Sequence, residues 1–440
     1  MLPRSVRFGY GMGSVATGTF GTVPGLMLLP YLTDTLGIAA GLAAVIVFLP
    51  KAWDVILNPI AGGISDRCRD ERGPRRPFLI KAGLALSACF ALLFASPDLG
   101  SKWADAAWVL VMFVACATAY AFFQVPYVAM PAEITDSYHE RTRLMTWRVA
   151  ILAFTIMLSG ATAPMLRNAF EGRMGYRVMG VVIACLLVVG VVGAYRGTAK
   201  APVGRVSAGG GSLRDQLRIV GESRDFTYLL GTFVLQALAV GAMLAGVDYM
   251  ARWVLGDKNL STVLFVCFVG PALLFTPLWS VIGKRIGKKQ GYLISSGVLI
   301  LAAVMLAFAR STPLWAVFTA TALVGLGYAG IQVFPMAMMP DAAAVDMRRT
   351  GENRVGVFTG VWTAGETLGM AMGPGLYATI LAMGGYISSD RPTDWTHLYQ
   401  PDSALNAITW GFSAVPAVLV AASLIPLWFY RLDEAEVSGA

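Results

Sequence analysis

Three polar side chains interrupt one long apolar stretch, and their types and spacing have the clearest chemical potential in the chain. They are Lys51, Asp54 and Asn58. On a helix, Asn58 lies one turn beyond Asp54 on the same face, and Lys51 lies three residues before Asp54. A carboxylate and an amide carbonyl can supply hard oxygen ligands to a small cation, and a lone buried acid can instead carry a proton. The alternative is an ion pair between Lys51 and Asp54 that only stabilises the helix.

A second acid and one arginine also lie in or beside apolar stretches. Glu366 has no basic residue close to it in the sequence. It can take part in proton or cation coupling, or remain a neutral acid that is hydrogen-bonded to a neighbouring helix. Arg148 can bind a substrate hydroxyl or carboxylate, pair with Asp54, or extend its head group to a membrane interface.

Several aromatic and amide side chains are candidates for the lining of a substrate cavity. Aromatic faces stack on sugar rings or steroid-like planes, and amides form hydrogen bonds with hydroxyl groups. Packing between helices is the alternative interpretation for each of them. Together with Arg148, the candidates are Gln124, Tyr127, Trp147, Gln332 and Trp362.

The composition indicates that these residues are carried by a membrane protein. Of the 440 residues, 56% are hydrophobic and 14% are charged, and the mean hydropathy is +0.64. A soluble chain normally carries about a quarter charged residues. The net charge of +8 sits in short loops between apolar blocks, so it indicates membrane topology and not nucleic-acid binding.

Long apolar blocks predict an all-α membrane protein with twelve transmembrane helices, since a span needs about 20 apolar residues. The predicted spans lie at 10–33, 41–64, 77–96, 105–130, 144–166, 176–195, 226–250, 260–283, 291–309, 313–339, 355–384 and 404–430. An ionisable side chain at the bilayer centre costs about 2.5–3.5 kcal/mol and usually serves function. This cost favours a functional role for Asp54.

A polar segment divides the chain into two halves. Residues 1–197 form the predicted N-terminal six-helix bundle, and residues 225–440 form the C-terminal one. Between them, residues 198–224 are predicted to be a cytoplasmic linker with a short amphipathic helix from Leu213 to Val220. Repeated bundles of this kind are common in secondary transporters.

The distribution of Lys and Arg predicts the orientation of the chain. Of the 34 Lys and Arg residues, 23 lie in segments that the predicted spans place on the same side of the membrane as the N-terminus. Eight lie in the loops on the opposite side, and three lie within or at the ends of spans. Both termini are therefore predicted to be cytoplasmic, in an inner (plasma) membrane. The first block follows Arg4 and Arg7 but is too long for a signal peptide, which predicts an uncleaved first helix.

Short charged motifs recur at matching points of the two halves, after the second and eighth spans and after the fourth and tenth. Charge pairs at such points can hold helices together and break as the halves move, although arginines there also follow from the orientation rule. We therefore predict a cytoplasmic gate. Its residues are Lys51, Gly62, Asp66, Arg67, Arg75, Arg76, Glu133, Asp136, Arg141, Asp341, Asp346 and Arg354.

Several other classes of chemistry are disfavoured. The five cysteines show no CxxC spacing and four lie in apolar stretches, which favours packing thiols over a disulfide or metal framework. No structural metal and no cofactor are predicted apart from a coupling ion, H⁺ or Na⁺. The chain has no GxxxxGK[ST] motif, so ATP is not the expected energy source.

Three ordered motifs resemble the glycoside–pentoside–hexuronide:cation symporters of the major facilitator superfamily, the group that contains the melibiose permease. The first comprises Trp53 to Pro59, Gly62 and Asp66-Arg67. The second comprises Pro126-Tyr127, Pro131, Glu133, Asp136, Glu140-Arg141-Thr142 and Arg148. The third comprises Pro340-Asp341, Asp346, Thr350-Gly351, Arg354 and Gly356. The resemblance implies two six-helix bundles related by a pseudo-two-fold axis, and solute transport coupled to sodium or protons.

The chain departs from this family at positions that matter for coupling and substrate. The family usually has a second acid where this chain has Asn58, and the melibiose permease has an acid where Gln124 stands. Fewer negative charges weaken a sodium site and leave proton coupling, weak sodium binding and uncoupled transport open. The acid and lysine that bind galactosides on the first helix are also absent, since Thr17 and Gly18 stand near those places.

The predicted function is symport of a sugar-like or glycoside-like polar solute by a chain that needs no partner subunit. One alternative keeps the fold and carries a lysolipid or another amphiphile, and efflux or an uncoupled path is a further one. A magnesium-dependent prenyltransferase-type enzyme is the last alternative, suggested by Asp66 and Asp70 with Asp341 and Asp346.

Overall fold

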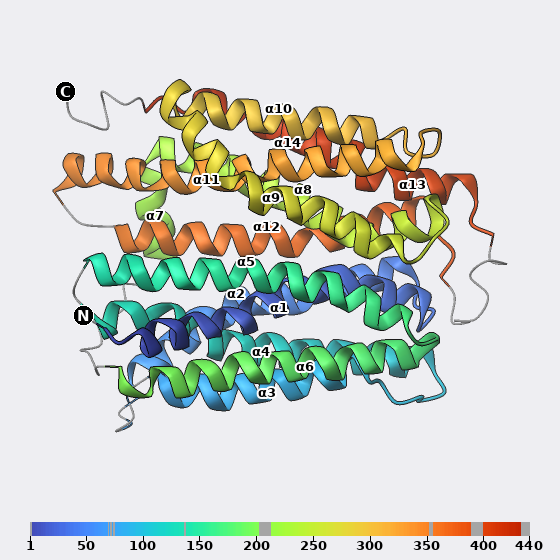
Figure 1. Ribbon diagram of the computed structural model, residues 1–440, viewed down its shortest axis with the longest axis horizontal. Coiled ribbons are helices and arrows are strands. Elements are labelled where there is room, and N and C mark those ends of the chain that lie inside the picture. Colours follow the sequence, from blue (N-terminus) through green and yellow to red (C-terminus); the bar gives the residue numbers. More distant parts are fainter. Residues whose placement is uncertain are drawn as a thin grey trace. The chain divides into compact units, whose positions relative to one another are not determined.

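The computed structural model describes residues 2–68, 70, 73, 75–135, 138–201, 213–351, 355–388 and 399–432, and all regular secondary structure in these ranges is helical (Figure 1). Eleven described segments are long and apolar enough to cross a membrane. Helix α12 (Val355–Met383) is also long enough, with 29 residues, but Glu366 and several glycines lower its hydropathy. These segments confirm the predicted all-α membrane fold.

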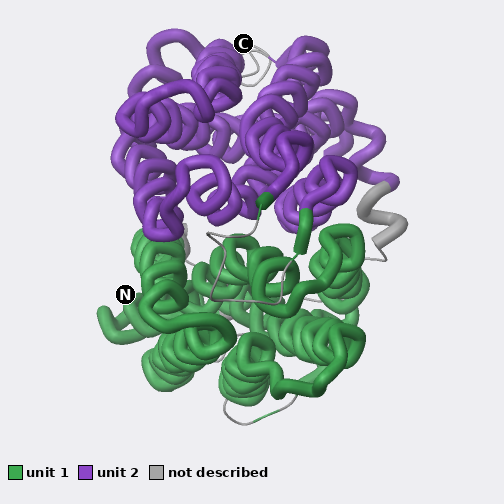
Figure 2. Tube along the Cα trace, turned by 90° about the vertical axis from the view of Figure 1, so that its right-hand side faces the viewer, with its two compact units in different colours: residues 1–209, 387–399 green, residues 210–386, 400–440 purple. Residues whose placement is uncertain are grey.

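The chain divides into two compact units, which Figure 2 shows in different colours. Unit 1 comprises residues 1–209 and 387–399, and unit 2 comprises residues 210–386 and 400–440. The helices of unit 1 are α1 (Arg4–Asp34), α2 (Ala40–Asp66), α3 (Arg76–Phe94), α4 (Lys102–Ile134), α5 (Tyr138–Asn168) and α6 (Gly172–Gly197), followed by the 3₁₀ turn η1 (Thr198–Lys200). Within this unit α1 packs against α5 and α6, α4 packs against α2 and α3, and α3 also packs against α6.

Unit 2 repeats this pattern of helix neighbours. Its elements are α7 (Leu213–Glu222), α8 (Arg224–Tyr249), the π-helical turn η2 (Met250–Val254), α9 (Leu260–Ile286), α10 (Lys288–Leu306), α11 (Leu314–Thr350), α12, α13 (Asp402–Phe412) and α14 (Ala414–Phe429). Helix α8 packs against α12 and α14, α11 packs against α9 and α10, and α10 also packs against α14. Thus α8, α11 and α12 hold the places that α1, α4 and α5 hold in unit 1.

Glycines allow helices to approach closely in both units. In unit 1, a Cβ atom on Gly9 of α1 would lie 2.3 Å from the Cα of Gly197 on α6. In unit 2, a Cβ atom on Gly373 of α12 would lie 2.3 Å from the carbonyl carbon of Gly241 on α8. Helices in lipid associate largely through such close packing of small residues.

One sequence prediction about a helix end needs correction. Helix α11 continues to Thr350, so Asp341 and Asp346 lie inside it and not in a loop after it. The prolines inside α11 do not end it, because in membrane proteins neighbouring groups can form hydrogen bonds with the backbone groups that a proline leaves unpaired. Asp248 of α8 is fully buried and pairs with Arg252 at 2.9 Å.

Candidate functional site

The polar residues of α2 lie where this helix packs against α1 and α4. Asp54 is buried, with 2% of its surface exposed, and its Oδ1 atom has no hydrogen-bond partner among the described residues. The Lys51 ammonium lies 5.1 Å from the ring centre of Phe20 and 6.0 Å from that of Phe113. Lys51 and Asp54 interact electrostatically, but they are not among the described ion pairs.

The predicted ion pair is therefore not what holds α2 in place. Apolar packing and one tryptophan hydrogen bond do so instead. Leu57 and Ala61 of α2 pack against Ala121 of α4, and the Trp53 indole N–H donates to the Thr118 hydroxyl at 3.1 Å. This leaves the Asp54 carboxylate available for a proton or a cation. Asn58 lies one turn further along the same helix and is half-buried.

Helix α4 presents three polar side chains at spacings that place them on one face, Tyr120, Gln124 and Tyr127. Tyr127 is fully buried: its hydroxyl donates to the carbonyl of Tyr10 at 2.9 Å and lies 3.0 Å from the Ser14 hydroxyl. The Gln124 Oε1 atom is buried without a partner among the described residues. Tyr127 is thus an anchor between α4 and α1, while Gln124 retains free hydrogen-bonding capacity.

Arg148 approaches this face from α5. Its guanidinium carbon lies 5.6 Å from the centre of the Tyr127 ring, and its Nη1 atom lies 3.9 Å from the sulfur of Met145. The buried Nε atom has no hydrogen-bond partner in the described part of the chain. The predicted pair with Asp54 is not formed, and Arg148 takes part in none of the ion pairs among the described residues. The adjacent Trp147 is 46% exposed and makes an edge contact with Phe8.

Two residues of this region were not among the sequence candidates. Tyr120 lies within electrostatic range of both Asp54 and Arg148. Tyr10 stacks on Tyr127 with ring centres 4.8 Å apart, and its buried hydroxyl has no described partner. Tyr120 could have been found from its position one turn before Gln124. Tyr10 carries no comparable signal, because only the packing of α1 against α4 reveals its neighbours.

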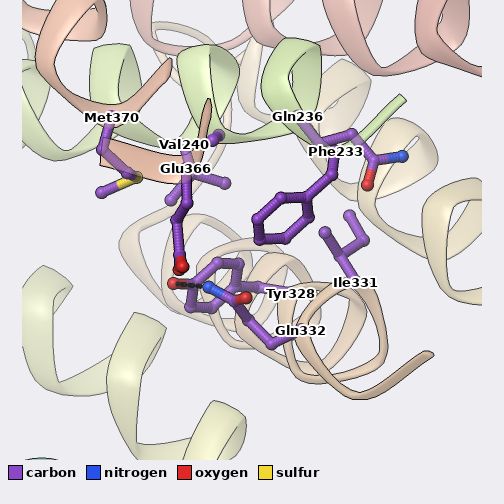
Figure 3. A pocket seen from close by; sticks show the side chains of 9 residues that line it. Phe233, Gln236, Val240, Tyr328, Ile331, Gln332, Glu366 and Met370 are labelled. Carbon is purple, nitrogen blue, oxygen red and sulfur yellow. Dashed lines mark hydrogen bonds between the residues drawn. The ribbon is translucent and has the colours of Figure 1, made fainter. Parts of the chain in front are cut away.

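Unit 2 holds a second polar group on the corresponding helices (Figure 3). The Gln332 amide donates to the Tyr328 hydroxyl at 2.6 Å, both on α11, and the Glu366 carboxylate of α12 points toward this pair. Phe233, Ile331 and Met370 complete much of the lining. The cavity of about 10 Å³ has room for about one water molecule. The group offers one carboxyl, one phenol and one amide.

Two other polar side chains near this cavity are committed to the core of unit 2. Gln236 donates to the hydroxyls of Ser296 and Ser423, at 3.1 and 2.9 Å, and accepts from Tyr292 at 2.7 Å. Trp362 is 1% exposed and stacks on Phe233 with ring centres 4.6 Å apart. Its indole N–H is buried without a described partner.

Among the predicted gate residues of unit 1, the arginines make contacts that connect helices. Arg75 donates to the Ser65 hydroxyl, and Arg76 donates to the Tyr195 carbonyl at 3.0 Å while its guanidinium lies over the Tyr195 ring. Arg67 is exposed, and a Cβ atom on Gly62 would meet only Val125, at 3.6 Å. Lys51 lies near the middle of α2, away from this end of the helix.

In unit 2, two predicted gate acids differ in their surroundings. Asp341 pairs with Lys288 of α10. Asp346 is 4% exposed, and both of its carboxylate oxygens lack a hydrogen-bond partner in the described part of the chain. The remaining gate predictions fall outside what the structure describes: the side chains of Asp66, Glu133 and Arg141, and the whole of Asp136 and Arg354.

A charged cluster that the sequence did not single out joins the first turns of α1 and α5. Glu140 is bound by the Arg7 guanidinium at 3.0 Å, by Arg143 at 3.1 Å and by the backbone N–H of Leu2 at 3.3 Å. Burial would raise the pKa of the Glu140 carboxyl, but these donors and positive charges hold it below the usual value. Glu140 belongs to the second motif, and Arg7 was counted only as a topology signal.

Comparisons with known proteins agree with this architecture. The family model described as MFS/sugar transport protein matches residues 9–434. A putative glycoside/cation symporter of Escherichia coli strain K12, YagG, is 24% identical over 98% of this chain and 93% of its own length. The isoprimeverose transporter of Lactiplantibacillus pentosus is 22% identical over 99% and 90%, respectively.

A similar fold occurs among solved structures. A bacterial homologue of the human lysosomal transporter Spinster, in an inward-facing and unoccupied conformation, matches with a TM-score of 0.70 and 13% identity over 97% of this chain and 95% of that chain. The family match leaves no support for the prenyltransferase alternative. The chain therefore belongs to the MFS/sugar transport protein family of the major facilitator superfamily, as its motifs predicted, and is a multi-pass membrane transporter and not an enzyme.

Proposed function

We propose that the protein is a secondary active transporter that imports a sugar-like or glycoside-like polar solute with a coupling ion, H⁺ or Na⁺. The observation that carries the coupling proposal is the buried Asp54 carboxylate, whose Oδ1 atom has no described hydrogen-bond partner. Ionisable groups at membrane depth are costly and are usually retained for function. Names of relatives that specify glycosides, isoprimeverose and cations support the choice of cargo.

The two polar groups have different proposed roles. On the proposed path, Asp54 and Asn58 take up the coupling ion, with Glu366 as a second titratable candidate. Gln124, Trp147 and Arg148 are the proposed solute-binding residues of unit 1, and Gln332 is the candidate of unit 2. Tyr127 and Trp362, both buried, contribute by positioning these side chains. The solute alternates between the two sides of the membrane as charged helix ends, such as Arg76 on Tyr195, form and break contacts.

The membrane placement follows from the loop charges. We propose that the chain lies in an inner (plasma) membrane with both termini cytoplasmic, because Lys and Arg crowd the loops on that side. Each polar group is built from helices of one unit of the same chain, so a monomer is proposed to be sufficient.

Uptake into proteoliposomes tests the proposal. The purified full chain would be reconstituted and given radiolabelled methyl glycosides, pentosides and hexuronides under an imposed Na⁺ gradient, an imposed H⁺ gradient or neither. We expect accumulation above the external concentration with one gradient, and its loss when an ionophore collapses that gradient. Flux that ignores both gradients would exclude coupling, and uptake confined to lysolipids would replace the sugar-like cargo with an amphiphile.

A further inference from the structure

Two basic side chains on neighbouring helices of unit 1 have no role in the proposed transport path. Lys81 lies on α3 and Arg196 lies in the last turn of α6, and both are exposed. Neither α3 nor α6 contains an acidic residue. Neither cation takes part in an ion pair among the residues that the structure describes. Both charges are therefore available to a ligand from outside the protein.

The two cations lie at the same end of the α3–α6 pair. Helix α3 begins at Arg76 and α6 ends at Gly197, and the two helices pack against each other (Figure 1). The Arg76 guanidinium donates to the Tyr195 carbonyl at 3.0 Å, so the start of α3 contacts the residue next to Arg196. Lys81 lies five residues further along α3, about 7.5 Å by the rise of an α-helix. A lysine side chain can cross much of that depth by extending toward the membrane surface.

Each cation is the first member of an exposed row on one face of its helix. The spacing of three, four and seven residues keeps each row on that face. The rows consist of Lys81, Leu84, Ala88 and Leu92 on α3, and of Arg196, Val189, Cys185 and Val182 on α6. Both helices are long and apolar enough to cross a membrane, so the exposed rows face lipid. The row on α3 is about 16 Å long, close to half of the roughly 30 Å hydrocarbon core, and therefore matches the acyl chains of one leaflet.

The corresponding helices of unit 2, α10 and α14, use their basic residues within the protein. Helix α10 begins with Lys288 and Lys289. Lys288 pairs with Asp341, and Lys289 donates to the Trp428 carbonyl at 3.2 Å. Helix α14 contains no basic residue. The pair of available cations on the lipid-facing side therefore distinguishes α3 and α6 from their counterparts.

We propose that the lipid-facing side of α3 and α6 binds an anionic phospholipid, whose phosphate is held by Lys81 and Arg196 and whose acyl chains lie along the two rows. Lysine and arginine near a membrane surface attract lipids with a net negative charge. A zwitterionic lipid carries its own positive charge beside the phosphate and compensates the two cations less well. This lipid site is separate from the polar faces of the transport path and does not depend on the cargo.

A matched pair of lipids tests the role of charge. Dioleoylphosphatidylglycerol and dioleoylphosphatidylcholine have the same acyl chains and differ in the charge of the headgroup. Native mass spectrometry of the detergent-purified full chain would give the dissociation constant of the first bound molecule of each. We expect phosphatidylglycerol to bind roughly tenfold more tightly. Equal binding of the two lipids, or displacement of phosphatidylglycerol by an equal concentration of inorganic phosphate, would overturn the inference.

Substitutions assign the preference to this surface. The double variant Lys81→Gln with Arg196→Gln should bring the two dissociation constants to within about threefold, and each single variant should lose part of the preference. The control is Lys284→Gln with Arg285→Gln, which removes the same two residue types from exposed positions in the last turn of α9. An unchanged preference in the first double variant, or an equal loss in the control, would contradict the assignment. If the first double variant does not fold, its two single variants decide the matter in the same way.

Discussion

The polar faces of the two units are built on corresponding helices but differ in charge and in hydrogen bonding. In unit 1, α1, α4 and α5 together with α2 carry an excess of positive charge, and Tyr10, Gln124 and Arg148 each keep a buried polar atom without a described partner. In unit 2, α8, α11 and α12 carry the acid Glu366, and Gln332 is already hydrogen-bonded to Tyr328. One fold thus carries two different kinds of site.

The difference suggests a division of work between the repeats. The unpartnered buried polar atoms of unit 1 suit a ligand that brings its own hydrogen-bonding groups. A carboxylate beside a phenol and an amide suits hydroxyl groups, which donate as well as accept. The two units share the same pattern of helix neighbours, because each polar group depends on close helix contacts that bring its side chains together.

The largest expected effect separates the two acids. Asp54→Asn keeps the shape of the side chain and removes its charge, so ion-driven accumulation in proteoliposomes should fall to the level of simple equilibration. Exchange of labelled for unlabelled solute should continue, because that step needs no net ion movement. Asp98→Asn is a suitable control, since its side chain is 77% exposed and lies outside the polar faces. Undiminished uphill uptake in Asp54→Asn would remove the coupling role of Asp54.

The acid of unit 2 should matter less for coupling and more for affinity. Hydrogen bonds to a charged group contribute about 1.5–3 kcal/mol, so Glu366→Gln should raise the KM for the solute by roughly tenfold or more. Because Glu366 is only the second titratable candidate for coupling, the accumulation ratio under an imposed gradient should fall far less than it does in Asp54→Asn. If accumulation disappears with Glu366→Gln as it does with Asp54→Asn, coupling involves both units and the proposed division of work is wrong.

The sequence is sufficient to predict the fold and most of the candidate residues of this contrast, but not the contacts that these residues make. Local patterns predict the all-α fold and mark Asp54, Gln124, Arg148 and Glu366 as candidates, because charged and polar side chains are rare within apolar blocks. The partners of these residues do not follow. Lys51 is three residues from Asp54, yet its ammonium lies over Phe20 and Phe113, which come from two other helices. The sequence around Tyr10 does not distinguish it from other aromatic residues of packed helices. Only the packing of α1 against α4 brings it onto Tyr127.

The helix crossings give a smaller effect that tests how similar the units are as scaffolds. Gly373→Ala in unit 2 would place a Cβ atom 2.3 Å from the Gly241 carbonyl carbon, in the middle of two helices that cannot easily move apart. Overpacking of this kind costs about 1–3 kcal/mol. Thermal unfolding in detergent should show the loss. Gly231→Ala on α8 is the control, because nothing lies within 4 Å of its added Cβ atom.

The same substitution in unit 1 sharpens the comparison. Gly9→Ala meets Gly197 at the same distance, 2.3 Å, but Gly197 is the last residue of α6. A helix end yields more readily than a helix centre, so Gly9→Ala should destabilise the protein less than Gly373→Ala. A larger loss for Gly9→Ala would show that the end of α6 is as constrained as the α8–α12 crossing.

The smallest expected effect is a pH-dependent change in stability, and it concerns the first turns of α1 and α5 in unit 1 and of α8 in unit 2. In unit 1, Glu140 joins α1 to α5 through Arg7, whereas in unit 2 Asp225 of α8 accepts from the backbone N–H of Arg431. Because the pKa of Glu140 is lower in the folded protein than its ordinary value of 4.5, the ionised carboxylate stabilises the fold above that pH. This stabilisation is lost as the pH falls through the folded pKa.

Glu140→Gln should therefore lower the unfolding temperature slightly at pH 7, and the difference from wild type should shrink as the pH falls below about 4.5. Hydrogen exchange at pH 7 should rise in the first turns of α1 and α5 and stay unchanged in the first turn of α8. A destabilisation that persists at low pH would mean that the neutral Glu140 side chain holds α1 and α5 together by packing alone. The ionic contact would then not distinguish unit 1 from unit 2.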